Sequence, residues 1–105
     1  MYGLIGKLKA HPGQRDSLAG YLLQGIEELR ALEGCYLYVI TLATDDPDTI
    51  WVTEVWRSQA DHRASLELET VRAAITAARP LLAEPPDGFE VTPLGGKGLP
   101  DPPES

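Results

Sequence analysis

Residues 35–57, which read CYLYVITLATDDPDTIWVTEVWR, decide the fold. The two ends of this stretch, residues 35–43 and 49–57, are almost entirely apolar, β-branched or aromatic, which is typical of β-strands. Residues 45–48 (DDPD) between them have the composition of a turn. The pattern therefore predicts an antiparallel hairpin whose loop is longer than two residues.

The segment before the hairpin predicts a strand followed by a helix. In residues 2–10 (YGLIGKLKA), Leu4 and Leu8 share one face of a strand and Ile5 falls on the other. Residues 14–32 predict a helix, because apolar side chains recur every three or four positions at Leu18, Leu22, Ile26 and Leu29.

The segment after the hairpin predicts a second helix and a last strand. Ser58 followed by Asp61 resembles a capping box and predicts a helix start. A break is expected near residues 69–70, with Thr70 as a second N-cap, and Pro80 must end or kink the helix. Residues 89–94 (FEVTPL) predict a short strand, which either lies at a sheet edge or ends at Pro93, because proline cannot donate to a ladder.

The resulting order is β-α-β-β-α-β, which predicts an α+β, ferredoxin-like fold with an antiparallel four-stranded sheet and both helices on one face. Residues 1–94 are expected to form this domain. Residues 95–105 (GGKGLPDPPES) are a Gly- and Pro-rich tail with too little apolar content to pack as an element.

The strands are apolar on both faces, whereas a sheet with one wet face should alternate. In residues 49–57, one face carries Ile50, Val52, Glu54 and Trp56, and the other carries Trp51, Thr53 and Val55. Since two helices cover only one face, a second copy of the chain is expected to cover the other, in a two-fold homodimer. The alternative is a monomer with a few exposed aromatic side chains.

Composition excludes several partners. The chain has 105 residues, with 16 acidic against 9 scattered basic residues and a net charge of −7. Nucleic acids and acidic membrane surfaces require clustered Lys and Arg, so neither is expected to bind. The single cysteine, Cys35, rules out an intrachain disulfide. No signal peptide or membrane span is expected, and we predict a cytoplasmic protein that binds a small ligand.

Three residues at the end of the hairpin could carry chemistry. Glu54 is a carboxylate inside an apolar strand, which indicates either an ion pair or an acid in a ligand pocket. Trp56 on the same face is either core packing or a flat pocket wall. His62, one turn into the following helix, is either a structural histidine or a general base.

Two more side chains have positions that the sequence leaves open. Tyr38 lies on the facing strand of the hairpin, and the residue that it opposes depends on a register that sequence does not determine. Arg72 points either toward a pocket, where it would bind substrate, or toward solvent. No His-Glu-x-x-His or Cys-x-x-Cys motif is present, so the sequence predicts no metal site.

Four segments together resemble the antibiotic biosynthesis monooxygenase family. Residues 54–62 (EVWRSQADH) resemble its E-x-W-x-s-x-x-x-H signature, and residues 9–14 (KAHPGQ) resemble its entry from strand to helix. Residues 34–38 (GCYLY) resemble its G-c-x-x-Y strand, and residues 79–82 (RPLL) resemble the end of its second helical region. The match spans roughly residues 2–94.

This resemblance implies a dimeric α/β barrel with a pocket in each subunit and a monooxygenase that needs no cofactor. The implied substrate is a small aromatic molecule, a quinol or polycyclic phenol. His62 would take its proton, Glu54 would orient the base or bind a hydroxyl, and Trp56 with Tyr38 would hold the ring. Because one fold hosts many activities, an isomerase or lyase in the same pocket and a non-catalytic ligand-binding domain remain alternatives.

Overall fold

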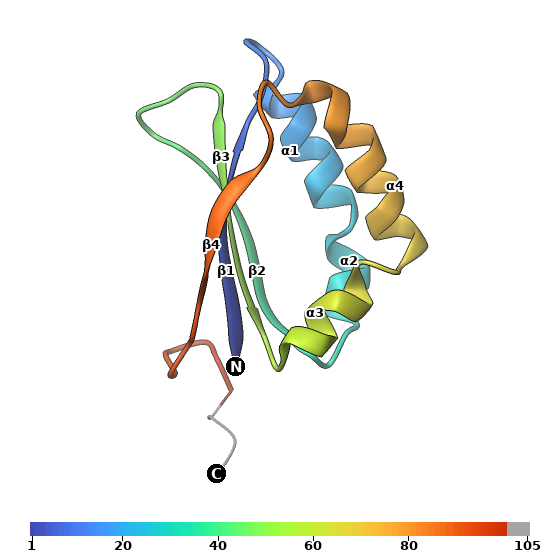
Figure 1. Ribbon diagram of the computed structural model, residues 1–105, viewed down its shortest axis with the longest axis vertical. Coiled ribbons are helices and arrows are strands. Elements are labelled where there is room, and N and C mark those ends of the chain that lie inside the picture. Colours follow the sequence, from blue (N-terminus) through green and yellow to red (C-terminus); the bar gives the residue numbers. More distant parts are fainter. Residues whose placement is uncertain (101–105) are drawn as a thin grey trace.

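The computed structural model describes residues 1–100 and shows one curved sheet with all the helices on one of its faces (Figure 1). The elements follow in the order β1 (Tyr2–Lys9), α1 (Arg15–Gln24), α2 (Ile26–Arg30), β2 (Cys35–Leu42), β3 (Thr49–Trp56), α3 (Gln59–Ser65), α4 (Glu69–Ala78), the 3-10 helix η1 (Arg79–Leu81) and β4 (Asp87–Val91). This arrangement confirms the ferredoxin-like α+β fold.

The four strands are antiparallel and lie in the order β2-β3-β1-β4. The expected edge position of the last strand is confirmed, but its expected span, residues 89–94, is wrong. The strand begins at Asp87 and ends at Val91. Because Pro93 has no N–H to donate, the ladder cannot continue through it. Residues 92–100 form no helix or strand.

The register of the hairpin brings Tyr38 directly opposite Glu54. An irregularity between Cys35 and Leu37 then pairs Cys35 with Trp56. Strict alternation would put Cys35 and Leu37 on the same face, but the extra residue in one strand moves Cys35 to the other face. Directly opposed residues share a face, so Tyr38 joins Glu54 beneath the helices.

The helical segments differ from the expected ones at two points. The single helix expected over residues 14–32 is interrupted at Gly25, which separates α1 from α2. The second N-cap is Leu68 and not Thr70, which lies within the first turn of α4. Pro80 does end the α-helix, since residues 79–81 continue as 3-10 helix.

The core lies between the sheet and α1, at the end of the molecule away from the described C-terminal segment. Leu18 of α1 and Ile50 of β3 are fully buried there, and Ala10, Val52 and Ala78 pack with them. Burying a side chain the size of leucine or isoleucine stabilises a fold by about 1.5–3 kcal/mol. This cluster therefore anchors α1 and the end of α4 to the sheet.

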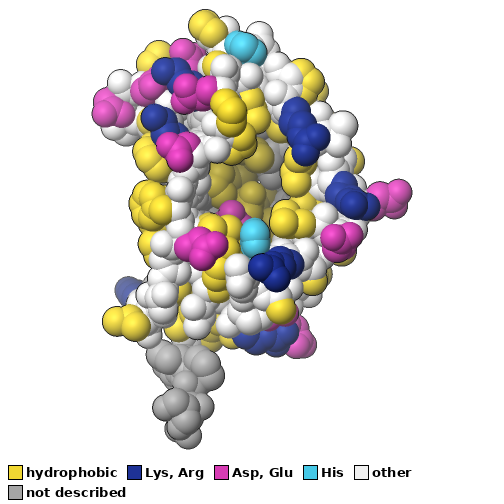
Figure 2. Space-filling view, in the orientation of Figure 1, with side chains coloured by type: hydrophobic (Ala, Val, Ile, Leu, Met, Phe, Trp, Pro, Cys, Tyr) yellow, Lys and Arg dark blue, Asp and Glu magenta, His cyan; other side chains and the backbone are white. Residues whose placement is uncertain are grey.

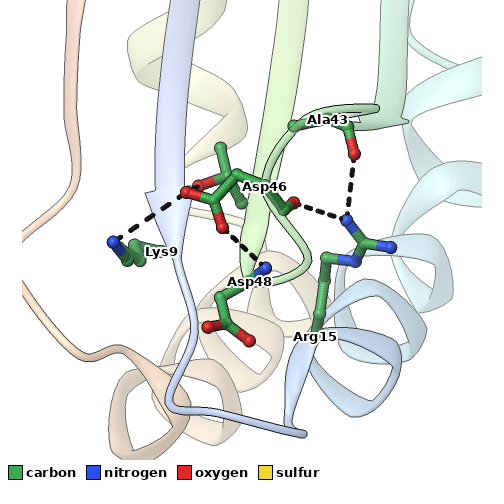
Figure 3. Close-up of polar contacts among 6 residues, drawn as sticks. Lys9, Arg15, Ala43, Asp46 and Asp48 are labelled. Carbon is green, nitrogen blue, oxygen red and sulfur yellow. Dashed lines mark hydrogen bonds and ion pairs between the residues drawn. The ribbon is translucent and has the colours of Figure 1, made fainter.

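Arg15 ties the loop of the hairpin to α1 (Figure 3). Its Nη1 atom donates to the carbonyl oxygens of Ala43, at 3.1 Å, and of Asp46, at 2.9 Å. The Asp46 carboxylate accepts from the backbone N–H of Asp48 at 2.9 Å and lies 3.9 Å from the Lys9 ammonium. The loop is thus held both by α1, through Arg15, and by β1, through Lys9.

Among residues 1–100, no helix is long and apolar enough to cross a membrane.

Candidate functional site

A cavity of about 280 Å³ lies between the inner face of the sheet and the helices. It opens as a deep hollow floored by apolar side chains, with a histidine at its edge and an acidic side chain inside it (Figure 2). Four of the five candidate site residues line this cavity: Tyr38, Glu54, Trp56 and His62. The structure therefore brings together side chains from β2, β3 and α3 that are up to 24 positions apart in the sequence.

The junction between β3 and α3 positions His62. Ser58 caps α3, accepting a hydrogen bond from the Asp61 backbone N–H at 3.1 Å and donating its hydroxyl to the Asp61 carboxylate at 2.7 Å. The Arg57 guanidinium donates to both oxygens of that carboxylate at 2.9 Å. Arg57, together with the Ser58 hydroxyl, lowers the pKa of Asp61 to about 2. The expected helix cap is confirmed, and it fixes the first turn of α3, where His62 lies.

Gly34 makes that junction possible from the other side. A Cβ atom at Gly34 would lie 2.5 Å from Cγ of Asp61, closer than any non-bonded carbon pair tolerates. The backbone oxygen of Gly34 accepts from the Arg57 N–H at 2.8 Å. The glycine thus lets the start of β2 pack directly against the end of β3 and the first turn of α3.

Glu54, Trp56 and His62 form one contact group inside the cavity. The indole Nε1 of Trp56 donates to Glu54 Oε1 at 3.0 Å. The same oxygen lies 3.7 Å from His62 Nε2, which is longer than a hydrogen bond. The imidazole and indole rings meet edge to face, with centroids 5.5 Å apart. Glu54 Oε1 therefore accepts a hydrogen bond from Trp56, while the His62 imidazole lies close to the same oxygen without a hydrogen bond to it.

Burial shifts both ionisable groups toward their neutral forms. The side chains of His62 and Glu54 are only 16% and 15% exposed. Burial raises the pKa of Glu54, and the hydrogen bond from Trp56 opposes that rise. Burial, with the nearby Arg63 charge, lowers the pKa of His62 below its usual value. A neutral imidazole beside a carboxyl group can accept a proton from a ligand.

Tyr38 supplies a neutral hydroxyl to the same space. Its register partner is Glu54 on the neighbouring strand. Burial, reinforced by the Glu54 charge, raises the pKa of the Tyr38 phenol. The hydroxyl therefore keeps its proton at neutral pH and can donate a hydrogen bond.

Two contributors to the site were missed in the sequence. The Tyr2 ring lies 5.6 Å from that of His62, centroid to centroid, and its hydroxyl donates to Glu90 Oε1 at 3.2 Å. Alternation in β1 could have revealed Tyr2, because it shares a face with Leu4. The buried Ser65 donates to the His62 carbonyl oxygen at 2.6 Å, and nothing in the sequence pattern marks it.

Arg72 lies away from this group. It is exposed on α4, its Nη2 atom is 3.8 Å from a Glu67 carboxylate oxygen, and it is not among the residues that line the cavity. Its contribution to substrate binding stays a prediction. Among residues 1–100, no three His, Cys, Asp or Glu side chains gather in a way that could hold a metal ion.

The fold is an α+β domain that encloses a small, mostly apolar cavity. The family model for antibiotic biosynthesis monooxygenases matches residues 1–77 of the chain. The protein therefore belongs to the antibiotic biosynthesis monooxygenase family, as the sequence motifs predict.

Solved structures agree with this assignment. A "putative antibiotic biosynthesis monooxygenase" from Chloroflexus aurantiacus is 46% identical, with a TM-score of 0.85 over 94% of this chain and 98% of that one. A Nitrosomonas europaea protein of unknown function is 28% identical, with a TM-score of 0.78 over 94% and 93%. A Mycobacterium tuberculosis protein at 21% identity and a TM-score of 0.81, over 91% and 97%, shows the fold alone. No curated protein sequence matches the chain.

Proposed function

We propose that the cavity binds a quinol or polycyclic phenol and that the protein oxidises it with dioxygen, without a cofactor. The observation that carries the proposal is the placement of Glu54 and His62, 3.7 Å apart, inside an otherwise mostly apolar cavity. Membership in a monooxygenase family supports the reaction type. An apolar pocket with a few convergent polar groups suits a flat aromatic ligand.

The chemistry needs only a base and an enclosed site. Dioxygen is a triplet and reacts slowly with closed-shell molecules, but a phenolate is electron-rich enough to pass it one electron. Recombination of the substrate radical with superoxide forms a bond between a ring carbon and oxygen and gives a hydroperoxide. Its O–O bond then breaks, so that one oxygen stays on the ring carbon and the other leaves as water with two hydrogens of the substrate. The balance is RH₂ + O₂ → RO + H₂O, so the substrate itself is the reductant.

Each cavity side chain has a distinct task in this proposal. His62, neutral because burial lowers its pKa, takes the phenolic proton. Glu54 then faces the imidazolium that forms and stabilises it, while Trp56 holds Glu54 in place. Tyr38 donates to a substrate oxygen, and the apolar walls exclude water, which strengthens each of these interactions.

Oxygen uptake with a panel of quinols and polycyclic phenols tests the function. We expect uptake by the wild-type protein, with one water formed for each oxygen consumed and no hydrogen peroxide. His62→Ala should lower kcat/KM by about 10²–10⁴-fold, the usual contribution of a general base. His11→Ala, at an exposed turn, is the matched control and should leave the rate unchanged.

The same assay separates the alternatives. Product formation without oxygen consumption would assign an isomerase or lyase that uses the same acid-base pair. Binding without any product would assign a ligand-binding domain. Uptake that is equal in wild type and His62→Ala would remove His62 from the mechanism.

We also propose that two copies of the chain pair through the open face of the sheet. All the helices lie on the opposite face (Figure 1), and the open face carries a continuous row, Val39, Thr53, Ile5 and Phe89, in register across the sheet. Val39 is 39% and Phe89 56% exposed. A mostly apolar row of this kind favours a second copy as its cover.

Sedimentation equilibrium tests the dimer, because it gives the mass in solution. We expect about twice the 11.4 kDa of one chain at micromolar concentration. Phe89→Lys should shift the mass toward one chain. Leu23→Lys, which alters an equally exposed side chain on the helical side, should not. A single-chain mass for the wild-type protein would contradict the proposal.

A further inference from the structure

Two glycines line the cavity from opposite walls. Gly6 lies in β1, in the sheet wall, and pairs with the cavity-lining Val52. Gly25 lies in the helical wall, between α1 and α2. The family motifs in the sequence include Glu54 and His62, but they include neither of these two glycines.

The backbone does not require a glycine at either place. Gly25 has φ −84° and ψ −5°, a conformation open to every residue except proline, and Gly6 has no positive φ. A glycine inside a helix or strand lowers stability relative to alanine. The reason for these glycines must therefore lie in the space around them.

That space belongs to the cavity. Gly25 is buried, yet a Cβ atom placed there would meet no other atom within 4 Å. A Cβ atom at Gly6 would meet only the backbone oxygens of Asp87 and Val52, at 3.8 and 3.9 Å, which is ordinary contact. Side chains at both positions would fit the fold, and they would occupy the cavity.

We propose that Gly6 and Gly25 set the size of the ligand, keeping the cavity large enough for fused aromatic rings in preference to a single ring. An apolar cavity of about 150 Å³ holds one benzene molecule. The cavity here is about 280 Å³, which leaves room for at least a second ring. This inference rests on the proposed function, because it takes from it that the ligand is aromatic. It adds the two residues that select the size of that ligand.

The test is ligand binding measured by isothermal titration calorimetry under argon, so that no turnover occurs. The probes are 1-naphthol, with two fused rings, and phenol, with one. We expect the wild-type protein to bind 1-naphthol at least tenfold more tightly than phenol. Gly25→Leu and Gly6→Val should weaken 1-naphthol binding at least tenfold and change phenol binding by less than threefold.

Gly20 provides the matched control. It is an exposed glycine of α1 whose Cβ atom would also meet nothing within 4 Å, and it does not line the cavity. Gly20→Leu should keep the ring-size preference of the wild-type protein. Thermal unfolding of every variant shows that it is folded, and Gly25→Ala, which adds a single methyl group, gives a smaller shift in the same direction if Gly25→Leu does not fold.

Two results would overturn the inference: an unchanged preference for 1-naphthol in the Gly25 and Gly6 variants, or equal binding of both probes by the wild-type protein. Because binding is measured without oxygen, failure of oxygen uptake would refute the proposed reaction and leave this result standing.

Discussion

The indole N–H of Trp56 donates to Oε1 of Glu54 at 3.0 Å, between two residues on the same face of β3. Trp56 is only 1% exposed, and its contribution to the cavity is to hold the Glu54 carboxylate in place. The indole ring also meets the His62 imidazole edge to face. A hydrogen bond that stabilises the charged form lowers the pKa of a carboxyl group. This contact therefore limits how far burial raises the pKa of Glu54.

The first prediction concerns this contact. Trp56→Phe removes the donor and leaves most of the ring, so the pKa of Glu54 should rise further, measured by NMR titration of the carboxyl carbon. The loss of a hydrogen bond to a charged group should also lower the free energy of unfolding by about 1–3 kcal/mol. Trp51→Phe makes the same change on the open face of β3, and should leave the pKa of Glu54 where it is in the wild-type protein.

The second prediction concerns the stability of the fold as pH changes. Because the pKa of Glu54 is raised on folding, the unfolded chain loses this proton first, and stability falls as pH rises from about 4.5 to the higher folded value. Glu54→Gln should remove this fall and leave the protein more stable than wild type at pH 8. Urea unfolding between pH 4 and 8 measures it. Glu67→Gln alters an exposed carboxylate and should follow the wild-type curve; a wild-type slope in Glu54→Gln would contradict the assignment.

The third prediction concerns the pH dependence of catalysis. His62 must be neutral to accept a proton, and its pKa lies below 6.5 because of burial and the Arg63 charge. The decrease of kcat/KM at acid pH should therefore have its midpoint below pH 6.5. Arg63→Gln removes the charge and should move that decrease toward pH 6.5. Arg79→Gln, an exposed arginine of η1, should leave it in place.

The fourth prediction concerns the hydrogen bonds by which Arg15 holds the hairpin loop against α1. Arg15→Met loses two hydrogen bonds to carbonyl oxygens, which should lower the free energy of unfolding by about 1–3 kcal/mol. The buried Nε atom of Arg15 has no hydrogen-bond partner among residues 1–100, and this unpaired donor offsets part of the stabilisation from the two hydrogen bonds. The loss of unfolding free energy in Arg15→Met should therefore lie at the low end of this range. Arg30→Met breaks only an exposed ion pair with Glu27 and should cost about 0–0.5 kcal/mol in the same denaturation experiment.

The order of the strands and helices could be predicted because its signals are local. The apolar, β-branched runs of the strands, the turn composition between them and the cap at Ser58 each depend on a few neighbouring residues, and the structure confirms them. Glu54 could be singled out for the same reason, since a carboxylate in an apolar strand is visible in the sequence. Its contact with Trp56 was also within reach, because residues two positions apart in a strand share a face.

The rest depends on packing across the fold. The register shift at Cys35 and Leu37 arises where β2 meets β3, and no local pattern specifies it. The break at Gly25 is also hidden, because its backbone angles stay helical and the apolar spacing of Leu22, Ile26 and Leu29 continues across it. The room that Gly25 leaves beside the cavity can be recognised only once the opposite wall is in place.

The last prediction concerns Gly34, which links the fold to the site. A methyl group there would overlap the Asp61 side chain, so Gly34→Ala must displace α3 or break the contacts among Ser58, Asp61 and Arg57. We expect a loss of about 1–3 kcal/mol in the free energy of unfolding, typical of overpacking at a fixed junction. Gly20→Ala should be neutral or stabilising, because its Cβ atom meets nothing. Because His62 lies one residue beyond Asp61, the folded fraction of Gly34→Ala should also lose oxygen uptake per folded molecule. Full activity per folded molecule would show that this junction supports the fold without positioning the imidazole.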